Sequence, residues 1–369
     1  MPERTLSAIV LAAGAGTRMK SSTPKPLHLL AGRAMLQYVL DSLADCSVER
    51  VVVVVGHGAE RVTKTLQTQE PDLHLTFVEQ HTQNGTGDAA SVGLTGLPDD
   101  DGPDSDLHDV LVLPGDMPLL QPSTIAALVA AHRETDAACT VLTARLADPG
   151  SYGRIVRGKD NQVTQIVERA DCTEEQVAID EINTAVYCFR RSVLAPVLRR
   201  ITPDNAQGEL YLTDVVAELR KAGYRVGAIE VADPADAEGI NDRLQLAAAE
   251  AELRRRTNER WLRAGVTLVD PASTYLDSTV QLASDVTLFP GTILQGSTVI
   301  GAGAEIGPNT RLVDCVVGAG AVVEQSNGRD AEIGADAKVG PFAVLAPGAS
   351  VPDGMVTGPF YAASGPDDG

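Results

Sequence analysis

The sequence predicts two folds in one chain, an α/β domain with a doubly wound, Rossmann-like sheet followed by a short left-handed parallel β-helix. Strand-like and helix-like segments alternate over the first ~240 residues, a rhythm typical of parallel sheets covered by helices. A glycine-rich turn at residues 14–16 follows the first of these strands. From Leu282 onward an apolar residue recurs at every sixth position, which is the hexapeptide period of a parallel β-helix.

Length and charge limit the classes of protein to which the chain can belong. Its 369 residues suffice for two domains that each bury a core. With 44% hydrophobic and 22% charged residues, the composition is that of a soluble globular protein. The net charge of −20 argues against nucleic acid or an anionic membrane surface as a partner, because both repel an acidic protein. Any polyanionic substrate must therefore meet a local basic pocket.

The cysteines and the apolar segments predict a cytoplasmic protein. Five scattered cysteines are odd in number and lack C-x-x-C spacing, which is typical of reduced thiols and indicates no metal site among them. The sequence shows neither the pattern of a signal peptide nor an apolar stretch of ~18 residues. We therefore expect neither nucleic acid nor a membrane among its partners.

The first strand and its glycine-rich turn predict a nucleotide site. Residues 6–11 form an apolar run that is typical of a buried parallel strand. At Gly14 and Gly16 the backbone can take positive φ and lie against a ligand, and successive N–H groups there bind anions. Arg18 and Lys25 place two cations beside this loop, as a nucleoside triphosphate requires. The alternative is an ordinary tight turn with solvated basic residues, since the spacing matches neither common phosphate-loop motif.

The alternation continues along the α/β domain and places polar segments at the carboxyl ends of strands, where such sheets bind ligands. We predict strands at 51–55, 73–78, 110–113 and 137–146, and helices at 35–43, 59–68, 86–97 and 123–133.

Two polar motifs follow predicted strands. Residues 79–87 contain two glutamines, whose amides suit the edge of a pyrimidine base, and glycines that allow close approach. Asp116 follows the strand at 110–113 and is a natural Mg²⁺ ligand, although an aspartate that caps a turn is the alternative. Further segments dense in Asn, Glu, Gly and Thr could bind sugar hydroxyls and an amide, although each alone is more typical of a turn or cap; they lie at 151–155, 166–168, 181–185 and 205–214.

The second half of the chain predicts a linker and a solenoid. Residues 243–265 are expected to form a linker helix that stops at Gly265. The six-residue period holds from Leu282 to Leu312, breaks near residues 327–328 and resumes from Ile333 to Val351, enough for about four coils. The expected organisation is a nucleotide-binding α/β domain at 1–242, a linker helix at 243–265, the β-helix at 266–351 and a tail at 352–369.

Seven motifs occur in an order that resembles the GlmU family, the bifunctional N-acetylglucosamine-1-phosphate uridyltransferases and glucosamine-1-phosphate acetyltransferases. The resemblance covers residues 6–345 and combines the glycine loop with the hexapeptide β-helix. The matching motifs are LAAGAGTRM at 11–19, PKPLH at 24–28, NGTG at 84–87, YGRI at 152–155, EINT at 181–184, NAQGELYLTD at 205–214 and EGIN at 238–241.

The resemblance implies a role for individual residues. It implies that Arg18 and Lys25 are the catalytic cations and that Asp116 and Asn241 hold Mg²⁺. The implied uridine pocket consists of Leu11, Ala12, Ala13, Gly14, Gln80, Gln83, Gly85 and Thr86, and the implied N-acetylhexosamine contacts are Gly153, Glu168, Asn183 and Thr213. The implied reaction joins UTP and N-acetylglucosamine-1-phosphate into UDP-N-acetylglucosamine, a cell-wall (peptidoglycan) precursor, with release of pyrophosphate. The family also implies a homotrimer assembled through the β-helix.

Departures from the family pattern keep alternatives open. Asp88, Pro114 and Ala185 differ from the usual family residues next to the base and sugar pockets, which leaves a different sugar-1-phosphate or nucleotide as an alternative. Ala346 stands where the family has an arginine before Pro-Gly, and the sequence ends at Gly369, before the later coils of the family. We therefore expect no acetyltransferase activity. A non-catalytic, regulatory protein that binds sugar nucleotides is the alternative from another class.

Overall fold

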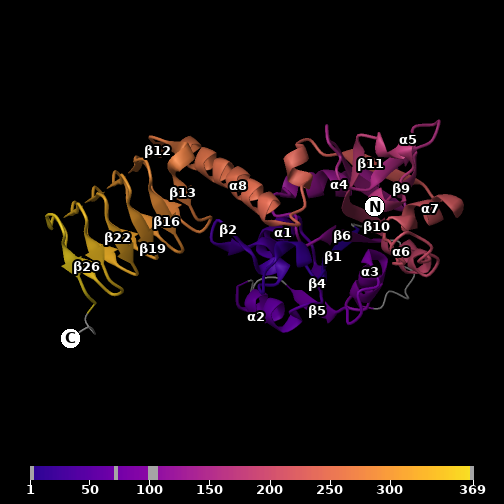
Figure 1. Ribbon diagram of the computed structural model, residues 1–369, viewed down its shortest axis with the longest axis horizontal. Helices are drawn as coiled ribbons and strands as arrows, with labels where there is room; N and C mark the ends of the chain where they lie inside the picture. The colour runs from indigo at the N-terminus through magenta and orange to yellow at the C-terminus, as the bar shows by residue number, and fades with distance from the viewer. Residues whose placement is uncertain (1–3, 70–73, 99–106, 366–369) are drawn as a thin grey trace. The chain divides into compact units, whose positions relative to one another are not determined.

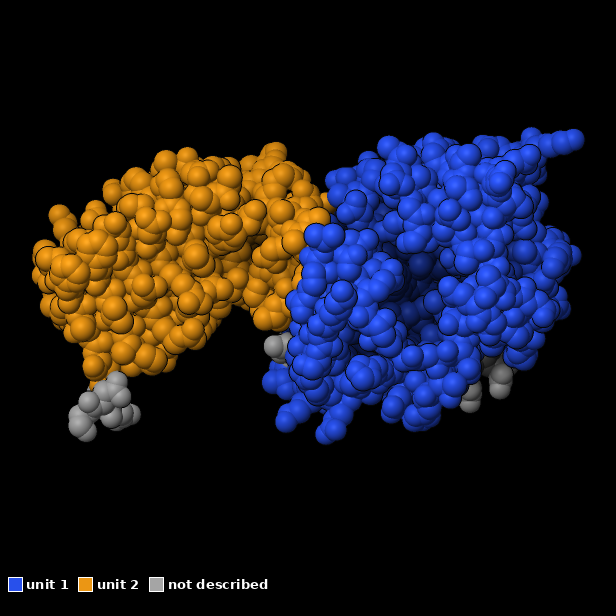
Figure 2. Space-filling view, viewed as in Figure 1, with its two compact units in different colours: residues 1–28, 34–245 blue, residues 29–33, 246–369 orange. Residues whose placement is uncertain are grey.

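The computed structural model describes residues 4–69, 74–98 and 107–365, and they form two compact units (Figures 1 and 2). The first unit comprises residues 1–28 and 34–245, and the second comprises residues 29–33 and 246–369. The short segment 29–33 belongs with the second unit because Ala31 N–H donates to Glu250 Oε2 at 2.8 Å and Ala31 O accepts from Ser278 N–H at 3.0 Å. No sequence pattern predicts that residues 29–33, which lie between two segments of the first unit, pack with the second unit.

The first unit contains a mixed sheet whose central strands are the buried apolar runs. Its order is β11-β7-β10-β6-β1-β4-β5, with β8 and β9 attached at the side of β10. β10 runs antiparallel to β6 and β7, while β1 is parallel to both β4 and β6. The strands are β1 (Thr5–Ala12), β4 (Arg50–Val55), β5 (Leu75–Glu79), β6 (His108–Pro114), β7 (Cys139–Arg145), β8 (Arg154–Arg157), β9 (Val163–Val167), β10 (Glu181–Arg190) and β11 (Val226–Glu230).

Helices cover both faces of this sheet, because alternate residues of each central strand point to opposite sides. In β1, Ile9 belongs to a buried cluster with residues of α3, α6 and α7, while Ala8 and Val10 belong to a second cluster with residues of α1, α2 and α4. Figure 1 shows helices on both sides of the sheet. The expected doubly wound arrangement is thereby confirmed. The helices are α1 (Met35–Ala44), α2 (Ala59–Gln69), α3 (Thr86–Leu94), α4 (Pro122–Thr135), α5 (Glu174–Val177), α6 (Arg191–Leu198) and α7 (Asp214–Lys221).

Several predicted elements differ from the observed ones. The strand predicted at 73–78 is β5, and Leu73 lies outside the described residues. The helix predicted at 86–97 ends at Leu94, just after Gly93, where a Cβ would fall 2.3 Å from Ile9 Cγ2, so the helix packs closely on the sheet. The segment 181–185 was expected only as a polar motif, yet it begins the ten-residue strand β10.

The second unit contains most of helix α8 (Arg243–Arg263) and a parallel β-helix. The helix begins at the residue predicted for the linker helix and ends two residues before the predicted end at Gly265. Three parallel sheets of five, six and five short strands stack as the faces of a prism, and the coils are drawn in orange to yellow in Figure 1. The expected short left-handed β-helix is confirmed. Its strands are β12 (Thr267–Leu268), β13 (Tyr275–Leu276), β14 (Gln281–Leu282), β15 (Thr287–Leu288), β16 (Ile293–Gln295), β17 (Val299–Ile300), β18 (Glu305–Ile306), β19 (Arg311–Val313), β20 (Val316–Val317), β21 (Val322–Val323), β22 (Asn327–Arg329), β23 (Glu332–Ile333), β24 (Lys338–Val339), β25 (Val344–Leu345), β26 (Ser350–Val351) and β27 (Ala362–Ala363).

The solenoid continues without interruption through the break in the six-residue period. Other residues take the inward positions there, and most of the spacings between them are shorter. Val317, Val323 and Gly328 occupy the inward positions between Leu312 and Ile333, with shorter corners. A Cβ at Gly328 would lie 3.0 Å from Leu312 Cδ2, so the smallest residue replaces the usual apolar side chain where the coil is tight.

The β-helix also extends beyond the expected limits of 266–351. β27 pairs with β25, and Val356 bridges to Lys338. The tail expected at 352–369 is therefore corrected: its first part continues the solenoid through Ala363, because its backbone pairs with the preceding coil. Residues 366–369 of that tail lie outside the described residues.

Candidate active site

A cavity of about 420 Å³ opens at the carboxyl ends of the central parallel strands of the first unit. Residues 11–14 line it at the end of β1, Gln80 follows β5, and Asp116 follows β6. Its far wall comes from the end of β9, from β10 and from the start of α7. The sequence-predicted residues that line this cavity are Leu11, Ala12, Ala13, Gly14, Lys25, Gln80, Gln83, Gly85, Thr86, Asp116, Glu168, Asn183 and Thr213.

Three predicted residues do not line the cavity and are held at its edge. Arg18 and Asn241 contact each other, with Arg18 Nη2 donating to Asn241 Oδ1 at 2.8 Å. Gly153 lies behind Asn183 and accepts a hydrogen bond from the Asn183 N–H at 2.9 Å. A Cβ at Gly153 would lie 3.4 Å from Glu168 Oε2, so this glycine packs against the carboxylate of another predicted residue.

The glycine loop takes the strained conformation at only one of the two predicted glycines. Gly16 has φ of 61°, and a Cβ there would fall 2.8 Å from Lys25 Cβ. Gly14 could also take positive φ, but it does not adopt this conformation. A Cβ on Gly14 would have no neighbour within 4 Å, so its smallness leaves open space beside the cavity. The loop then continues into a short 3-10 turn, Thr17–Met19, which carries Arg18.

Two cations and two oxygen ligands converge beside this loop from three distant parts of the chain. The Lys25 ammonium donates to Asp116 Oδ2 and, at 3.1 Å, to Asn241 Oδ1. A backbone hydrogen bond joins the segment of Asp116 to that of Asn241, because Ile240 N–H donates to the Asp116 carbonyl at 2.9 Å. Only 14% of the Lys25 side chain is exposed, so water screens this contact weakly.

The donor set at this point fits Mg²⁺. Asp116 and Asn241 offer one carboxylate and one amide oxygen to a common point, where the Lys25 ammonium now sits. Mg²⁺ prefers such oxygen ligands and commonly takes one or two from the protein and the rest from substrate phosphates and water. Among the described residues no group of three or more His, Cys, Asp or Glu side chains could hold a metal. A cation here would take its remaining ligands from substrate phosphates and water.

The end of the cavity next to β5 is built from amides and close backbone. Gln80 is 5% exposed, and Gln83 Nε2 donates to the Ala13 carbonyl at 2.9 Å. Gly85 has φ of 109°, and a Cβ there would fall 2.5 Å from the Leu210 carbonyl oxygen. Only glycine fits at this position, which brings the backbone of the loop after β5 up to the cavity wall.

The opposite end is built from Glu168, Thr213 and Asn183. Glu168 Oε1 accepts a hydrogen bond from the Thr213 hydroxyl at 3.1 Å. Burial raises the pKa of Glu168, and the Thr213 hydrogen bond offsets this only in part. Asn183 Oδ1 accepts from the Ala185 N–H at 3.1 Å, while its Nδ2 donates to the Tyr187 hydroxyl at 2.8 Å. These contacts fix the orientation of the Asn183 amide at the cavity wall.

Sequence reasoning missed several residues of this site. Tyr187 lines the cavity and orients Asn183, but the polar segment 181–185 before it is more typical of a turn or cap than of a strand, so the sequence does not indicate this position. The Tyr152 hydroxyl accepts from the Gly239 N–H at 3.2 Å, which ties the segment before Asn241 to the sheet. Ala185 lies at the β10 irregularity with φ of 62°, a conformation that costs an alanine about 1–2 kcal/mol. The departure from glycine was the only signal for this strain.

A Gly-rich loop after the first strand, two cations beside a carboxylate and an amide oxygen, and a cavity between amide and carboxylate walls are features of a nucleotidyltransferase. Residues 8–222 match the MobA-like NTP transferase domain family. The chain is 46% identical to the Bifunctional protein GlmU of Corynebacterium aurimucosum over 97% of this chain and 72% of that relative. It is 48% identical to that of Rhodococcus jostii over 94% of this chain and 69% of the relative, and 44% identical to that of Heliobacterium modesticaldum over 98% and 76%.

The chain belongs to the GlmU family. This membership confirms the resemblance drawn from the seven motifs, and with it the expected enzyme class, a nucleotidyltransferase of the UDP-N-acetylglucosamine pyrophosphorylase type. Within the part of the chain that is described, no helix has both the length and the apolar character needed to cross a membrane.

Proposed function

We propose that the chain forms UDP-N-acetylglucosamine and pyrophosphate from UTP and N-acetylglucosamine-1-phosphate, with Mg²⁺ as its cofactor. The observation that carries this proposal is the meeting of Lys25, Asp116 and Asn241 beside the glycine loop, between an amide-lined end and an end lined by Glu168. A long substrate with a base, a chain of phosphates and a sugar fits a cavity whose two ends differ in this way.

The proposed reaction needs positioning and charge neutralisation rather than a protein nucleophile. A phosphate oxygen of the sugar-1-phosphate attacks the α-phosphorus of UTP in line, a new P–O bond forms, and the bond to the β-phosphate breaks as pyrophosphate leaves. The attacking phosphate is already ionised, so no general base is required. Bound Mg²⁺ would supply neutralisation of phosphate charge from its place on Asp116 and Asn241.

The side chains of the protein supply the remaining work. Lys25 and Arg18 lie beside the glycine loop, where their charges would stabilise the triphosphate and the leaving pyrophosphate. The loop backbone would hold the phosphates through its N–H groups. Gln80 and Gln83 would read the base, and Glu168, Asn183 and Thr213 would bind the hydroxyl and acetamido groups of the sugar.

Pyrophosphate release from a panel of substrates tests this proposal. We expect UTP with N-acetylglucosamine-1-phosphate to be the best pair, by at least about tenfold in kcat/KM over ATP, GTP or glucose-1-phosphate, because one or two lost hydrogen bonds cost that much. Equal use of a purine nucleotide would show that the base pocket is misassigned. Preference for another sugar-1-phosphate would favour the alternative substrate, and tight binding of UDP-sugar without turnover would favour the regulatory protein.

We further propose that the β-helix serves assembly rather than acetyl transfer. Outward-facing Val299 and Val316 are 36% and 50% exposed on one face, and exposed Phe342 and Phe360 stack with their ring centroids 5.3 Å apart. Packing of three prisms would cover such apolar residues. Light scattering on the intact protein at micromolar concentration is expected to give a trimer, and a monomer would contradict the assembly role.

The proposed lack of acetyltransferase activity rests on Ala346, which replaces the basic residue of the family motif in the described coil. No thiol release from acetyl-CoA with glucosamine-1-phosphate is expected, and release at a rate similar to the uridylyl transfer would contradict this part. A cytoplasmic location is also proposed, supported by five cysteines that are all free thiols.

A further inference from the structure

The orientation of the Gln80 side chain is set by two acceptors on its nitrogen. Gln80 Nε2 donates to the Gly85 carbonyl at 3.2 Å and to Asp88 Oδ2 at 2.7 Å. A rotated amide would turn its oxygen toward a carbonyl and a carboxylate, which is repulsive at both positions. The assignment of nitrogen and oxygen in this amide therefore follows from its surroundings.

In this orientation Gln80 can only accept a hydrogen bond from a ligand. Both hydrogens of Nε2 are engaged, and Oε1 accepts no hydrogen bond from any residue that the structure describes. Because Gln80 lines the cavity, Oε1 is the atom that a bound base can meet, and it can only accept a hydrogen bond. Uracil carries a hydrogen on N3 and can donate to it, whereas N3 of cytosine carries a lone pair and would be repelled.

We propose that Asp88 is a specificity-determining positioning residue, which holds the Gln80 amide so that the site accepts a uracil and rejects a cytosine. This inference rests on the proposed function, because it concerns the base of the same nucleotide. Asp88 does not line the cavity, so it acts through Gln80 rather than on the base. Its hydrogen bond is the shorter of the two on Nε2 and is assisted by charge, which makes it the stronger hold.

A purely structural role for Asp88 makes a different prediction. Asp88 lies in the first turn of α3, where a carboxylate stabilises the positive end of the helix dipole. Loss of that stabilisation would weaken all nucleotides together. The ratio of affinities for two pyrimidine nucleotides separates the two roles, because a change in the Gln80 orientation alters the preference between uracil and cytosine, whereas a weaker helix affects both nucleotides alike.

The test measures dissociation constants of UDP and CDP by titration calorimetry on the intact protein with Mg²⁺ present. We expect the wild type to prefer UDP by about tenfold or more, and Asp88→Ala to lose about tenfold of that ratio. Asp88→Asn retains an acceptor oxygen and is expected to keep most of the preference. Glu60→Ala is the matched control, because Glu60 is likewise an acid in the first turn of a helix, α2, but lies outside the cavity lining.

An unchanged ratio in Asp88→Ala, or a wild type that binds UDP and CDP equally, would overturn the inference. A parallel loss of both affinities would also overturn it, because that result describes a helix-stabilising residue. Pyrophosphate release from UTP is followed separately. A wild type that selects UDP through Asp88 yet releases no pyrophosphate would refute the proposed function and leave the inference supported.

Discussion

Replacement of Asp116 by alanine is expected to lower kcat for pyrophosphate release by about 10²–10³-fold, because a metal and its ligands contribute several kcal/mol to stabilising phosphoryl charge. The melting temperature should stay near that of the wild type. The Asp116 side chain is 23% exposed, and Lys25 keeps Asn241 Oδ1 as a partner at 3.1 Å when the carboxylate is removed. Steady-state kinetics over a range of Mg²⁺ concentrations, with thermal unfolding in parallel, measures both quantities.

Glu175→Ala is a suitable control for the loss of a negative charge, since Glu175 is an exposed residue of α5 outside the cavity lining. Its kcat is expected to match that of the wild type. If Asp116→Ala retained turnover within about threefold of the wild type, Asp116 would not be a metal ligand, because the expected loss is at least thirtyfold larger.

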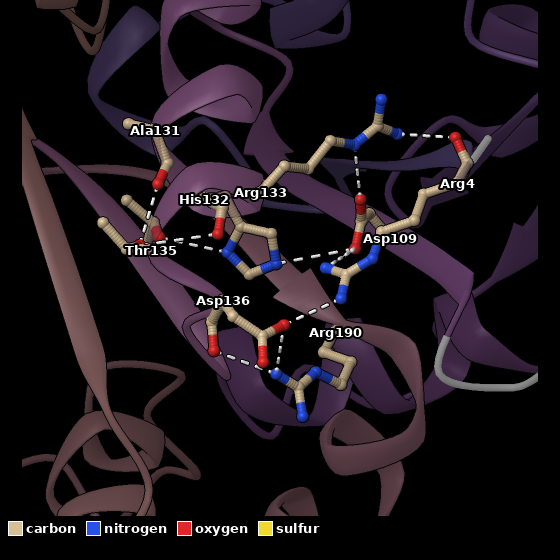
Figure 3. A network of polar contacts seen from close by, with 9 residues as sticks. Arg4, Asp109, Ala131, His132, Arg133, Thr135, Asp136 and Arg190 are labelled. Carbon is tan, nitrogen blue, oxygen red and sulfur yellow. Dashed lines mark hydrogen bonds and ion pairs between the residues drawn. The ribbon is translucent and has the colours of Figure 1, made fainter. Parts of the chain in front are cut away.

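A second large effect is expected on stability, from Asp109 at the start of β6. Its side chain is fully buried, and Oδ2 accepts from Arg133 Nε at 2.8 Å (Figure 3). His132 Nε2 and Arg4 Nη1 lie 3.5 and 3.7 Å from Oδ1. Asp109→Asn removes the buried negative charge and leaves the partly exposed Arg133 and Arg4 guanidinium groups without their carboxylate, and breaking a buried ion pair typically costs about 3–5 kcal/mol in the free energy of unfolding. Denaturant unfolding at neutral pH measures this loss.

The same network contains the matched control. Asp136 contacts Arg4 at 2.8 Å and Arg190 at 3.0 Å, but 68% of its side chain is exposed (Figure 3). Asp136→Asn should therefore cost at most about 1 kcal/mol. Similar losses in the two variants would contradict the role assigned to burial. Turnover should remain near wild type in both variants, because Asp109 lies at the opposite end of β6 from the cavity.

The pH dependence of unfolding provides an independent check on Asp109. Burial by itself raises the pKa of Asp109, but the nearby His132 and the hydrogen-bonded Arg133 lower it below its ordinary value. A carboxyl whose pKa is lower in the folded state stabilises the fold above its unfolded pKa of about 3.9 and loses that contribution as the pH falls through the folded pKa. The wild type should lose stability below about pH 4 more steeply than Asp109→Asn does.

Local patterns predicted the central layers of the fold well. The strand expected at 6–11 is β1 (Thr5–Ala12), and the one expected at 51–55 is β4 (Arg50–Val55). Both are unbroken apolar runs, because a central parallel strand is buried on its two faces and leaves no room for polar residues. The β-helix period was equally clear, since each coil repeats the same inward position.

Patterns were less informative where pairing between distant segments decides the structure. β10 carries the polar residues of a binding motif, so its first half resembled a loop, and its antiparallel insertion between β6 and β7 has no local signature. The solenoid continued past Val351 because residues near Val356 and Ala362 pair with the coil before them, although their own sequence, rich in Gly and Pro, is typical of a tail.

Some residues of the candidate site were predictable from the sequence, and others were not. Motifs and family resemblance predicted the glycine loop, Lys25, Asp116 and Asn241, and the structure brings these residues together at one end of the sheet. The contact of Gln80 with Asp88, the support of Asn183 by Tyr187 and the tie between Tyr152 and Gly239 became visible only in the folded chain.

The sequence by itself thus determined which segments form strands, helices and coils, and which residue types could serve a nucleotide. Apolar periodicity and glycine conformation are local properties, so they can be recognised without knowledge of the fold. Only the tertiary structure decided which way each side-chain amide points, which strand runs antiparallel, and that segment 29–33 joins the second unit. These features depend on hydrogen bonds between residues far apart in the chain, and local sequence patterns do not predict which distant residues pair.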